Sequence, residues 1–525
     1  MGWPSTARAI GVLTAPVIPL FVVCGCAARH PISTRAVALT EAQSLVHAGC
    51  YSCLREALAT LERAALARTT PEVARAAFTT SILLVVRARE LGLPDEQSIE
   101  RAQFWSRHVQ PTTGQLPTSA YFDAIALIQG DTSGLPPRER ERRATERRWG
   151  WTADGSVPPA RAALSSHLAE DIAAEYIALT LDCEDAQARK TLAADEVLAR
   201  HPVPLIRFRL HVCLGHEDGL RRLVETDPRW GDTYYIRGRL AMVRRPSPNL
   251  LEAASLLIAA HEAFPESQAM ILALAGVRNA LADHAGALVL FDAVLKVQPR
   301  HPDALLGRLL SQSYLNRHAE AVGTATALIE LGTDHMSAAW YWRAWNRYHL
   351  RALAEAWRDV TNAISFDASA STYTLAGVIA YARQWPVTAI ARLRTAYALD
   401  SGHCDAVWTE ALVHVDQEDW RTAAWRFAIA VDCYGHAAEQ GKRELDVARQ
   451  NARTNPLHAR EVGLAQDRLE RAERRRAQSA FNAANSSARA GDRQVALTYL
   501  AVAASHPLMA KKSAELKRQI LVMPQ

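Results

Sequence analysis

The sequence lacks the short motifs by which the common enzyme classes are recognised. It contains no phosphate loop ending in Gly-Lys-Ser/Thr, no His-Glu-x-x-His, no Gly-x-Ser-x-Gly and no dinucleotide fingerprint. Its 18 histidines are scattered along the chain. We therefore expect no catalytic residue, no metal site and no cofactor, and we interpret the chain as a binding protein rather than an enzyme.

A charge of one sign is also missing, and strand signals are sparse. The chain has 60 Lys and Arg against 55 Asp and Glu, a net charge of +5 that is small for 525 residues. Nucleic acid is therefore not an expected partner, because its binding usually requires a concentrated basic face. The one basic cluster, Arg138 to Arg148, is interleaved with glutamates and is interpreted as a solvated surface. Apolar residues follow helical spacing almost everywhere, which predicts an all-α protein.

No apolar run is long enough to cross a membrane comfortably. The longest begins at Ile10 and ends at Val23, and Pro16 and Pro19 interrupt it. A membrane helix needs about 20 apolar residues. Together with the positive charge at Arg8, this run has the character of the apolar region of a secretory signal.

One alanine recurs about every 34 residues through the middle of the chain. Apolar or small residues follow it at the fourth and seventh positions. The recurring alanines are Ala253, Ala287, Ala321, Ala356, Ala389 and Ala423. A small residue followed by apolar residues at this spacing forms one face of a helix that packs closely on another helix. A period of about 34 residues is typical of arrays with two helices per unit.

The pattern resembles the tetratricopeptide repeat family over roughly residues 234–437. Gly377 occupies the position at which the family prefers a small residue on the first helix, and Pro265 and Pro299 close the first two units. The later units lack this closing proline. The resemblance implies a right-handed superhelical solenoid of helical hairpins that binds partners rather than turning over substrates.

A second resemblance concerns the end of the apolar run, Val23-Cys24-Gly25-Cys26. It resembles a bacterial lipobox, with Val23 and Gly25 at the positions that precede the modified cysteine. The resemblance implies a signal peptide at residues 1–25, acylation of Cys26 and a tether at residues 26–37. Several acyl chains together would anchor the chain firmly to a membrane. Plain secretion, with cleavage nearby, is the alternative.

Irregular helical regions flank the regular array, which we place at residues 231–437. Residues 38–230 are interpreted as degenerate helical hairpins interrupted by Gly- and Pro-rich loops. Residues 438–525 are interpreted as a charged helical cap with a last repeat-like unit, because Ala496, Leu500 and Ala503 have the repeat spacing. Terminal repeats need a polar outer face, so capping is favoured over a second interaction surface.

Six further cysteines suit an oxidising compartment, where an even number suggests pairing. The predicted pairs are Cys404 with Cys433, Cys50 with Cys53, and Cys183 with Cys213. Cys404 opens a first helix and Cys433 is expected to end the second helix of the same unit, so the antiparallel helices bring them together. A redox or metal site at Cys50 and Cys53 is the alternative. It is disfavoured because a second Cys-x-x-Cys and a βαβ context are missing.

The family resemblance places a partner-binding groove on the first helices of the units. The candidate groove residues are Asn279, Tyr341, Trp345, Tyr348, Tyr381 and Trp408. Aromatic residues in such a groove supply large contact areas at little entropic cost. For Tyr341 and Trp345, packing between helices is the alternative. Asp303 and Asp405 look isolated among apolar groove positions, which disfavours an enzyme with clustered carboxylates.

These observations predict a non-catalytic, membrane-anchored scaffold of the bacterial cell envelope. The expected location is the periplasmic face of the outer membrane. The expected partners are another envelope protein, bound in the groove, and the lipid bilayer, bound through acylated Cys26. The alternative is a lipoprotein that binds a sugar or a peptide and is associated with transport.

Overall fold

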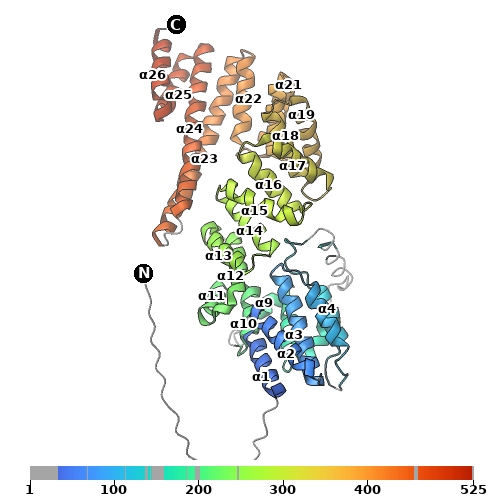
Figure 1. The fold of residues 1–525 in the computed structure, drawn as a ribbon. Coiled ribbons are helices and arrows are strands. Elements are labelled where there is room, and N and C mark those ends of the chain that lie inside the picture. The colour runs from blue at the N-terminus through green and yellow to red at the C-terminus, as the bar shows by residue number, and fades with distance from the viewer. Residues whose placement is uncertain are drawn as a thin grey trace, which may run out of the picture.

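The computed structural model is an elongated stack of helices, from α1 at the lower end of Figure 1 to α26 at the upper end. It describes residues 34–67, 69–112, 114–135, 140–141, 144, 159–184, 186–194, 201–244, 248–454 and 459–522. Every element of regular secondary structure among these residues is helical, as the sequence predicts. Each helix in the same ranges is too short or too polar to act as a membrane span.

The N-terminal half contains helices of unequal length, from 6 residues in α7 to 20 in α3. The signal segment 1–25 and the predicted lipidation site Cys26 lie outside the described residues, and α1 already begins inside the segment assigned to the tether. The elements are α1 (Thr34–Ala48), α2 (Tyr51–Ala67), α3 (Pro71–Glu90), α4 (Glu96–Ser106), α5 (Thr118–Leu127), α7 (Pro159–Leu164), η1 (Ser165–His167), α8 (Ile172–Glu184), α9 (Ala186–Ala194), α10 (Pro204–Leu214), α11 (Glu217–Thr226) and η3 (Pro228–Asp232).

Helices then alternate as first and second members of hairpins. The pairs are α12 (Thr233–Val243) with α13 (Leu250–Ala263), α14 (Gln268–Ala280) with α15 (His284–Val297), α16 (Pro302–Tyr314) with α17 (His318–Glu330), α18 (Met336–His349) with α19 (Leu353–Phe366), α20 (Ala370–Ala382) with α21 (Pro386–Leu399), and α22 (Cys404–Asp416) with α23 (Trp420–Thr454). Ser267, Asp283 and Ser369 cap their helices by accepting a backbone N–H bond. The chain therefore starts these helices where the sequence supplies a short polar side chain.

The recurring alanine is the point of closest contact within each unit. All six of these alanines have no exposed surface, and the residues seven places later have none in any of the six units. Gly377 on α20 meets the second helix in the same way, since a Cβ there would lie 2.5 Å from Leu393 Cγ. Small side chains at these positions let the two helices approach closely, and no larger residue fits without displacing a neighbour.

The turns between first and second helices repeat as regularly as the alanines. One residue in each of five successive turns has a positive φ near 60°, and none of them is glycine. They are Ala282, Asn316, Arg351, Gln384 and Glu418. The following residue donates its N–H to the carbonyl five positions earlier, as in the bond from Asp283 to Arg278 at 2.8 Å. This is the Schellman closure of a helix. The same closure ends α10 and α24, where the left-handed residue is a glycine, Gly215 or Gly491.

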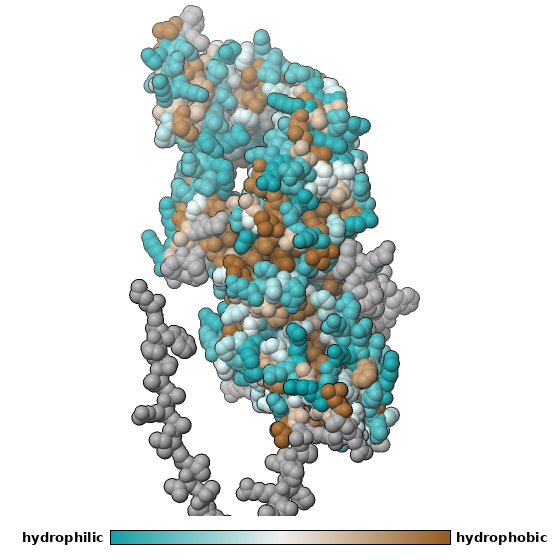
Figure 2. All heavy atoms as spheres, viewed as in Figure 1, coloured by the Kyte–Doolittle hydropathy of each residue, from teal (hydrophilic) through white to brown (hydrophobic). Residues whose placement is uncertain are grey.

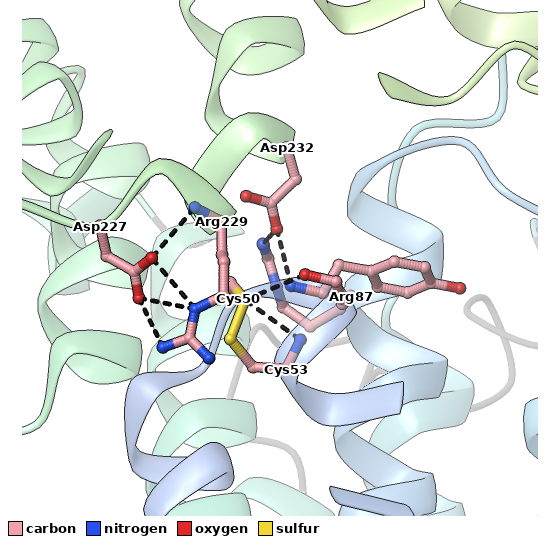
Figure 3. The surroundings of a disulfide bond; sticks show 8 residues. Cys50, Cys53, Arg87, Asp227, Arg229 and Asp232 are labelled. Atoms are coloured by element: carbon pink, nitrogen blue, oxygen red, sulfur yellow. Dashed lines mark hydrogen bonds and ion pairs between the residues drawn. A yellow bond between two sulfur atoms is a disulfide. The ribbon is translucent and has the colours of Figure 1, made fainter. Parts of the chain in front are cut away.

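A buried network of charges holds the N-terminal half together. Arg87 on α3 is fully buried and pairs with Asp232 and with Glu90, the latter at 2.6 Å. Glu90 also accepts bonds from Tyr176 on α8 and Arg209 on α10. Figure 3 shows Arg87 and Asp232 beside the disulfide at the start of α2. A single cluster of paired charges thus joins helices that are distant in the sequence.

The C-terminal part begins as an extension of the array. The second helix of the sixth pair, α23, continues far beyond the repeat and packs along α24 (Ala459–Arg489), followed by α25 (Arg493–Ala504) and α26 (Pro507–Val522). Figure 1 shows α23 and α24 as a long antiparallel pair. Leu464, near the tip of this pair, packs against the apolar cluster of α12 to α14. The C-terminal region therefore covers the last unit and also reaches back to the beginning of the array.

Three disulfides join the cysteine pairs named from the sequence: Cys50 with Cys53, Cys183 with Cys213, and Cys404 with Cys433. One detail of the sequence argument was wrong, because α23 does not end at Cys433 but continues to Thr454. The helix continues because α24 provides a surface along which it can pack. Cys50 and Cys53 have no exposed surface, so this disulfide lies inside the core.

Candidate partner-binding face

The helices α14, α16, α18, α20 and α22 form what we call the first-helix face. Tyr341, Trp345 and Tyr348 of this face all lie on α18. Their rings are half-buried and pack against the apolar cluster formed by α18, α19 and α20. Burial raises the pKa of Tyr341 above its ordinary value. These three residues therefore combine the two roles that the sequence left open, since each contributes to packing and keeps part of its ring exposed.

Asn279 has a different role from the one expected of an open groove residue. Its side chain donates to the carbonyl of Gly307 and accepts from Ser311 at 3.0 Å. It also bonds His284 Nδ1 at 2.9 Å. Asn279 thus joins α14, α15 and α16, and its hydrogen-bonding capacity is largely used within the array.

Tyr381 and Trp408 lie nearer the end of the array and are also engaged. The hydroxyl of Tyr381 donates to Asp416 at 2.5 Å, and burial followed by this carboxylate raises the pKa of Tyr381. The guanidinium of Arg475, on α24, lies 4.8 Å from the ring centroid of Trp408. The C-terminal region therefore covers the part of the first-helix face around Trp408.

A continuous row of aromatic and imidazole rings crosses three units at the ends of the first helices. The rings of the row, in spatial order, are His284, Tyr314, Trp342, Trp345, His349 and His318, with neighbouring centroids 4.6 to 6.4 Å apart. His284 and Tyr314 are stacked, as are His318 and His349. Burial lowers the pKa of His284 and His349, which favours neutral rings that stack without repulsion.

Sequence reasoning found only Trp345 of this ring row. A signal was present, because His284 and His318 are 34 residues apart and each opens a second helix. Tyr314 is 57% exposed, so the row is open to solvent at this ring. Figure 2 shows hydrophobic side chains gathered over α14 to α16, in the middle of the view.

A loop of the N-terminal half lies against the beginning of the array. We call residues 131–135 the docked loop. Asp131 accepts bonds from Tyr235 and Arg239 on α12. Farther along, the carbonyl of Ser133 bonds His301 Nε2 at 2.7 Å, and the carbonyl of Gly134 accepts from Gln298 at 3.0 Å. Side chains of successive units therefore bind a non-helical segment of polypeptide, largely through its backbone.

Asp303 lies next to this loop and is not isolated, in contrast to the sequence-based expectation. Its carboxylate pairs with Arg140 at 3.0 Å and with His335 at 2.7 Å. Partial burial would raise its pKa, but His335, Arg140 and His301 together hold the pKa below its ordinary value. Asp405 is also engaged, since it accepts from Tyr434 at 2.5 Å. Only the pair of Asp303 with Arg140 bridges segments distant in sequence, since Asp405 and Tyr434 belong to one hairpin and Asp303 and His335 to adjacent units.

The described residues contain no cluster of three or more side chains suited to holding a metal ion. The first-helix face offers aromatic ring surfaces and hydrogen-bond donors. Each unit of about 34 residues pairs two helices and buries the same alanine, and in five of the six units the first helix ends in the same left-handed turn. The array has the fold of a tetratricopeptide repeat solenoid.

No family model and no curated protein sequence matches the chain. Solved tetratricopeptide structures resemble it in fold. A structure titled YrrB, "a TPR protein with an unusual peptide-binding site", is 15% identical, covers 43% of this chain and 97% of its own, and has a TM-score of 0.29. A tetratricopeptide repeat protein from Parabacteroides merdae is 16% identical, with 47% and 93% covered and a TM-score of 0.36. MamA is 17% identical, with 32% and 97% covered and a TM-score of 0.29. Because these TM-scores are low, the repeat assignment rests on the geometry of this chain.

Proposed function

We propose that this protein is a non-catalytic scaffold that holds a segment of a partner protein on the first-helix face of its array. The docked loop is the observation that carries the proposal. Gln298 at the C-terminal end of α15 and His301 at the N-terminal end of α16 already bind a non-helical segment through its carbonyl groups. Backbone carbonyls occur in every polypeptide, so the same type of contact suits a segment of another protein.

The ring row offers the surface for that partner. It lies at the opposite ends of α15 and α16 from the docked loop, and it exposes Tyr314 and His349, whose rings contact the half-buried Trp342 and Trp345. Aromatic residues dominate the energy of many protein interfaces because they bury a large area with few rotatable bonds. The partner segment is therefore expected to place apolar side chains on these rings.

The location is part of the same proposal. The lipobox-like sequence at Cys26 supports a lipid anchor on the periplasmic face of the outer membrane, with another envelope protein as partner. The three disulfides support an oxidising compartment, since such bonds persist mainly outside the cytosol.

Site-specific photocrosslinking in cells tests the binding face. A photoreactive residue at Leu350, which is 47% exposed beside the ring row, should crosslink to one partner protein. Substituting Tyr314→Ala together with His349→Ala should abolish that product without disturbing the core. Phe366→Ala is the matched control, because Phe366 has the same 57% exposure as Tyr314 but lies outside the row. If the crosslink persists in the double variant, the ring row is not the site.

Two further results would change the proposal. A small molecule that copurifies with the wild type and is lost in the double variant would favour the sugar- or peptide-binding alternative, for which stacked rings are also suited. For the anchor, Cys26→Ser should release the protein from the membrane fraction. Continued membrane association of that variant would contradict lipidation at this position.

A further inference from the structure

A cavity in the N-terminal half lies between α10 and α11, away from the first-helix face. Its volume is about 610 Å³, and its apolar walls include Pro204, Leu223 and Trp230. Arg207, His211 and Arg222 also line it. A second cavity, of about 650 Å³, shares His211 and Arg222 with the first. The two cavities therefore adjoin at a cluster of basic side chains.

The arginines around this cluster fall into two groups. Most have carboxylate partners: Arg221 pairs with Asp218 at 2.5 Å, Arg229 pairs with Asp227 at 2.8 Å, and Arg244 pairs with two glutamates. The guanidinium groups of Arg207 and Arg222, which line the cavity, have no hydrogen-bond or ion-pair partner among the described residues. The Nε of Arg207 is buried without an acceptor. Buried donors in proteins almost always have a partner, so an unpartnered one calls for an explanation.

His211 adds a third donor to the same wall. Its Nδ1 is buried without a partner. Burial, followed by the positive charges of His216, Arg222 and Arg207, lowers the pKa of His211 to about 4. The carboxylates that line the two cavities have other partners: Asp227 pairs with Arg229, Glu217 with Arg244 and Asp218 with Arg221.

Gly219 on α11 keeps this wall open. A Cβ at that position would lie 2.4 Å from the Cε1 of His211. Any larger residue would push the imidazole out of its place. The backbone of α11 thus approaches His211 closely, and Arg222, three residues later on the same helix, can reach the cavity.

We infer that the cavity between α10 and α11 binds a phosphate group through Arg207, Arg222 and His211. Two guanidinium groups from different helices can surround a tetrahedral oxyanion, and arginine is the residue best suited to such contacts. The apolar wall at Leu223 and Trp230 suits an organic group attached to the phosphate. The phosphate belongs either to a small soluble molecule or to a phospholipid head group. The site is independent of partner binding at the ring row.

Calorimetric titration of the full-length chain with inorganic phosphate at pH 7 tests this site. Binding is expected in the wild type, and Arg222→Gln should weaken it by about ten- to a hundredfold, because a charge-assisted hydrogen bond is lost. Arg222 is exposed, so its substitution should not affect folding. Arg221→Gln is the matched control: it is the adjacent residue on the same helix but has two carboxylate partners. Acetate should bind more weakly than phosphate.

Two further measurements separate the phosphate sources and test His211. Cosedimentation of the unacylated Cys26→Ser chain with vesicles that contain an anionic phospholipid should be lost on adding Arg222→Gln if the natural ligand is a head group, and should be absent from the start if it is soluble. An NMR titration of His211 should show its pKa rising when phosphate is present, because an anion stabilises the protonated ring. Equal phosphate affinity in Arg221→Gln and Arg222→Gln would overturn the proposal. The absence of both phosphate and vesicle binding in the wild type would also overturn it.

Discussion

The N-terminal half and the repeat array bury charged groups in different ways. In the N-terminal half, Arg87 pairs with Asp232 across 145 residues, and Arg209 pairs with Glu90 across 119. In the array, Arg343 pairs with Asp359 within one hairpin and Arg394 pairs with Glu410 between adjacent hairpins, each over 16 residues. The array is therefore stabilised by local contacts, and the N-terminal half by contacts between segments that only the complete fold brings together.

This difference arises because the array is built from repeated units and the N-terminal half is not. A repeat unit touches only its neighbours, so its contacts have a short and constant spacing in the sequence. The N-terminal helices have unequal lengths and no common period, so apolar contacts alone would leave several arrangements with similar energies. A buried network of paired charges and hydrogen bonds penalises the wrong arrangements, because each of them would leave charges unpaired.

The largest effect is expected from Asp232→Ala, which leaves Arg87 buried and without its partner on η3. We expect a loss of about 3–5 kcal/mol in the free energy of unfolding. Asp218→Ala removes an exposed pair and should change it by less than about 0.5 kcal/mol. Hydrogen exchange should rise together in α2, α3, α8 and α10 in the first variant. The comparison is contradicted if Asp359→Ala, in the array, raises hydrogen exchange over as many helices as Asp232→Ala does.

Removing a disulfide that closes a long loop should lower the stability of the protein more than removing one that closes a short loop. Cys404 and Cys433 are 29 residues apart, whereas Cys50 and Cys53 are three apart. The entropy of the unfolded chain predicts a loss of about 3–4 kcal/mol for the first pair replaced by alanine and about 2 kcal/mol for the second. Denaturant unfolding of the two double variants measures this, and a larger loss at Cys50 and Cys53 would contradict the prediction.

Overpacking should show that the array depends on its small residues. Ala356→Leu inserts a larger side chain into a contact without exposed surface, and should destabilise the protein by about 1–3 kcal/mol. Ala354→Leu, two residues earlier on α19 at an exposed position, is the control and should leave stability unchanged. If both variants melt like the wild type, the assignment of the repeat register is wrong.

The smallest effects are expected at the left-handed turns. Gln384→Gly and Glu418→Gly should each stabilise the protein by about 0.5–1 kcal/mol, because these residues now hold a positive φ that side chains disfavour. Gly491→Ala should destabilise it, although nothing lies within 4 Å of the added Cβ. Gly323→Ala, in an open helical position, should instead stabilise it. Thermal unfolding would refute this explanation if Gly491→Ala and Gly323→Ala shift the melting temperature in the same direction.

The sequence by itself determined the repeat array. Its alanine spacing located the buried contact of each hairpin, and the same register brought Cys404 and Cys433 together. These features are local, because helical periodicity and a hairpin turn define which residues meet. The amino-acid sequence alone is therefore enough to predict these contacts. Most of the ring row was missed, although its histidines also follow the period, because ring contacts depend on side chains from three units at once.

Only the tertiary structure decided the remaining features. It brought Arg87 to Asp232, laid the docked loop against α12 and α16, placed Arg475 over Trp408, and gathered Arg207, His211 and Arg222 around one cavity. Apart from Arg207 and His211, which lie one turn apart on α10, these contacts join different elements, and several cross many units. Their sequence separations follow no period, and which of many possible partners a charged side chain meets depends on how the whole chain packs.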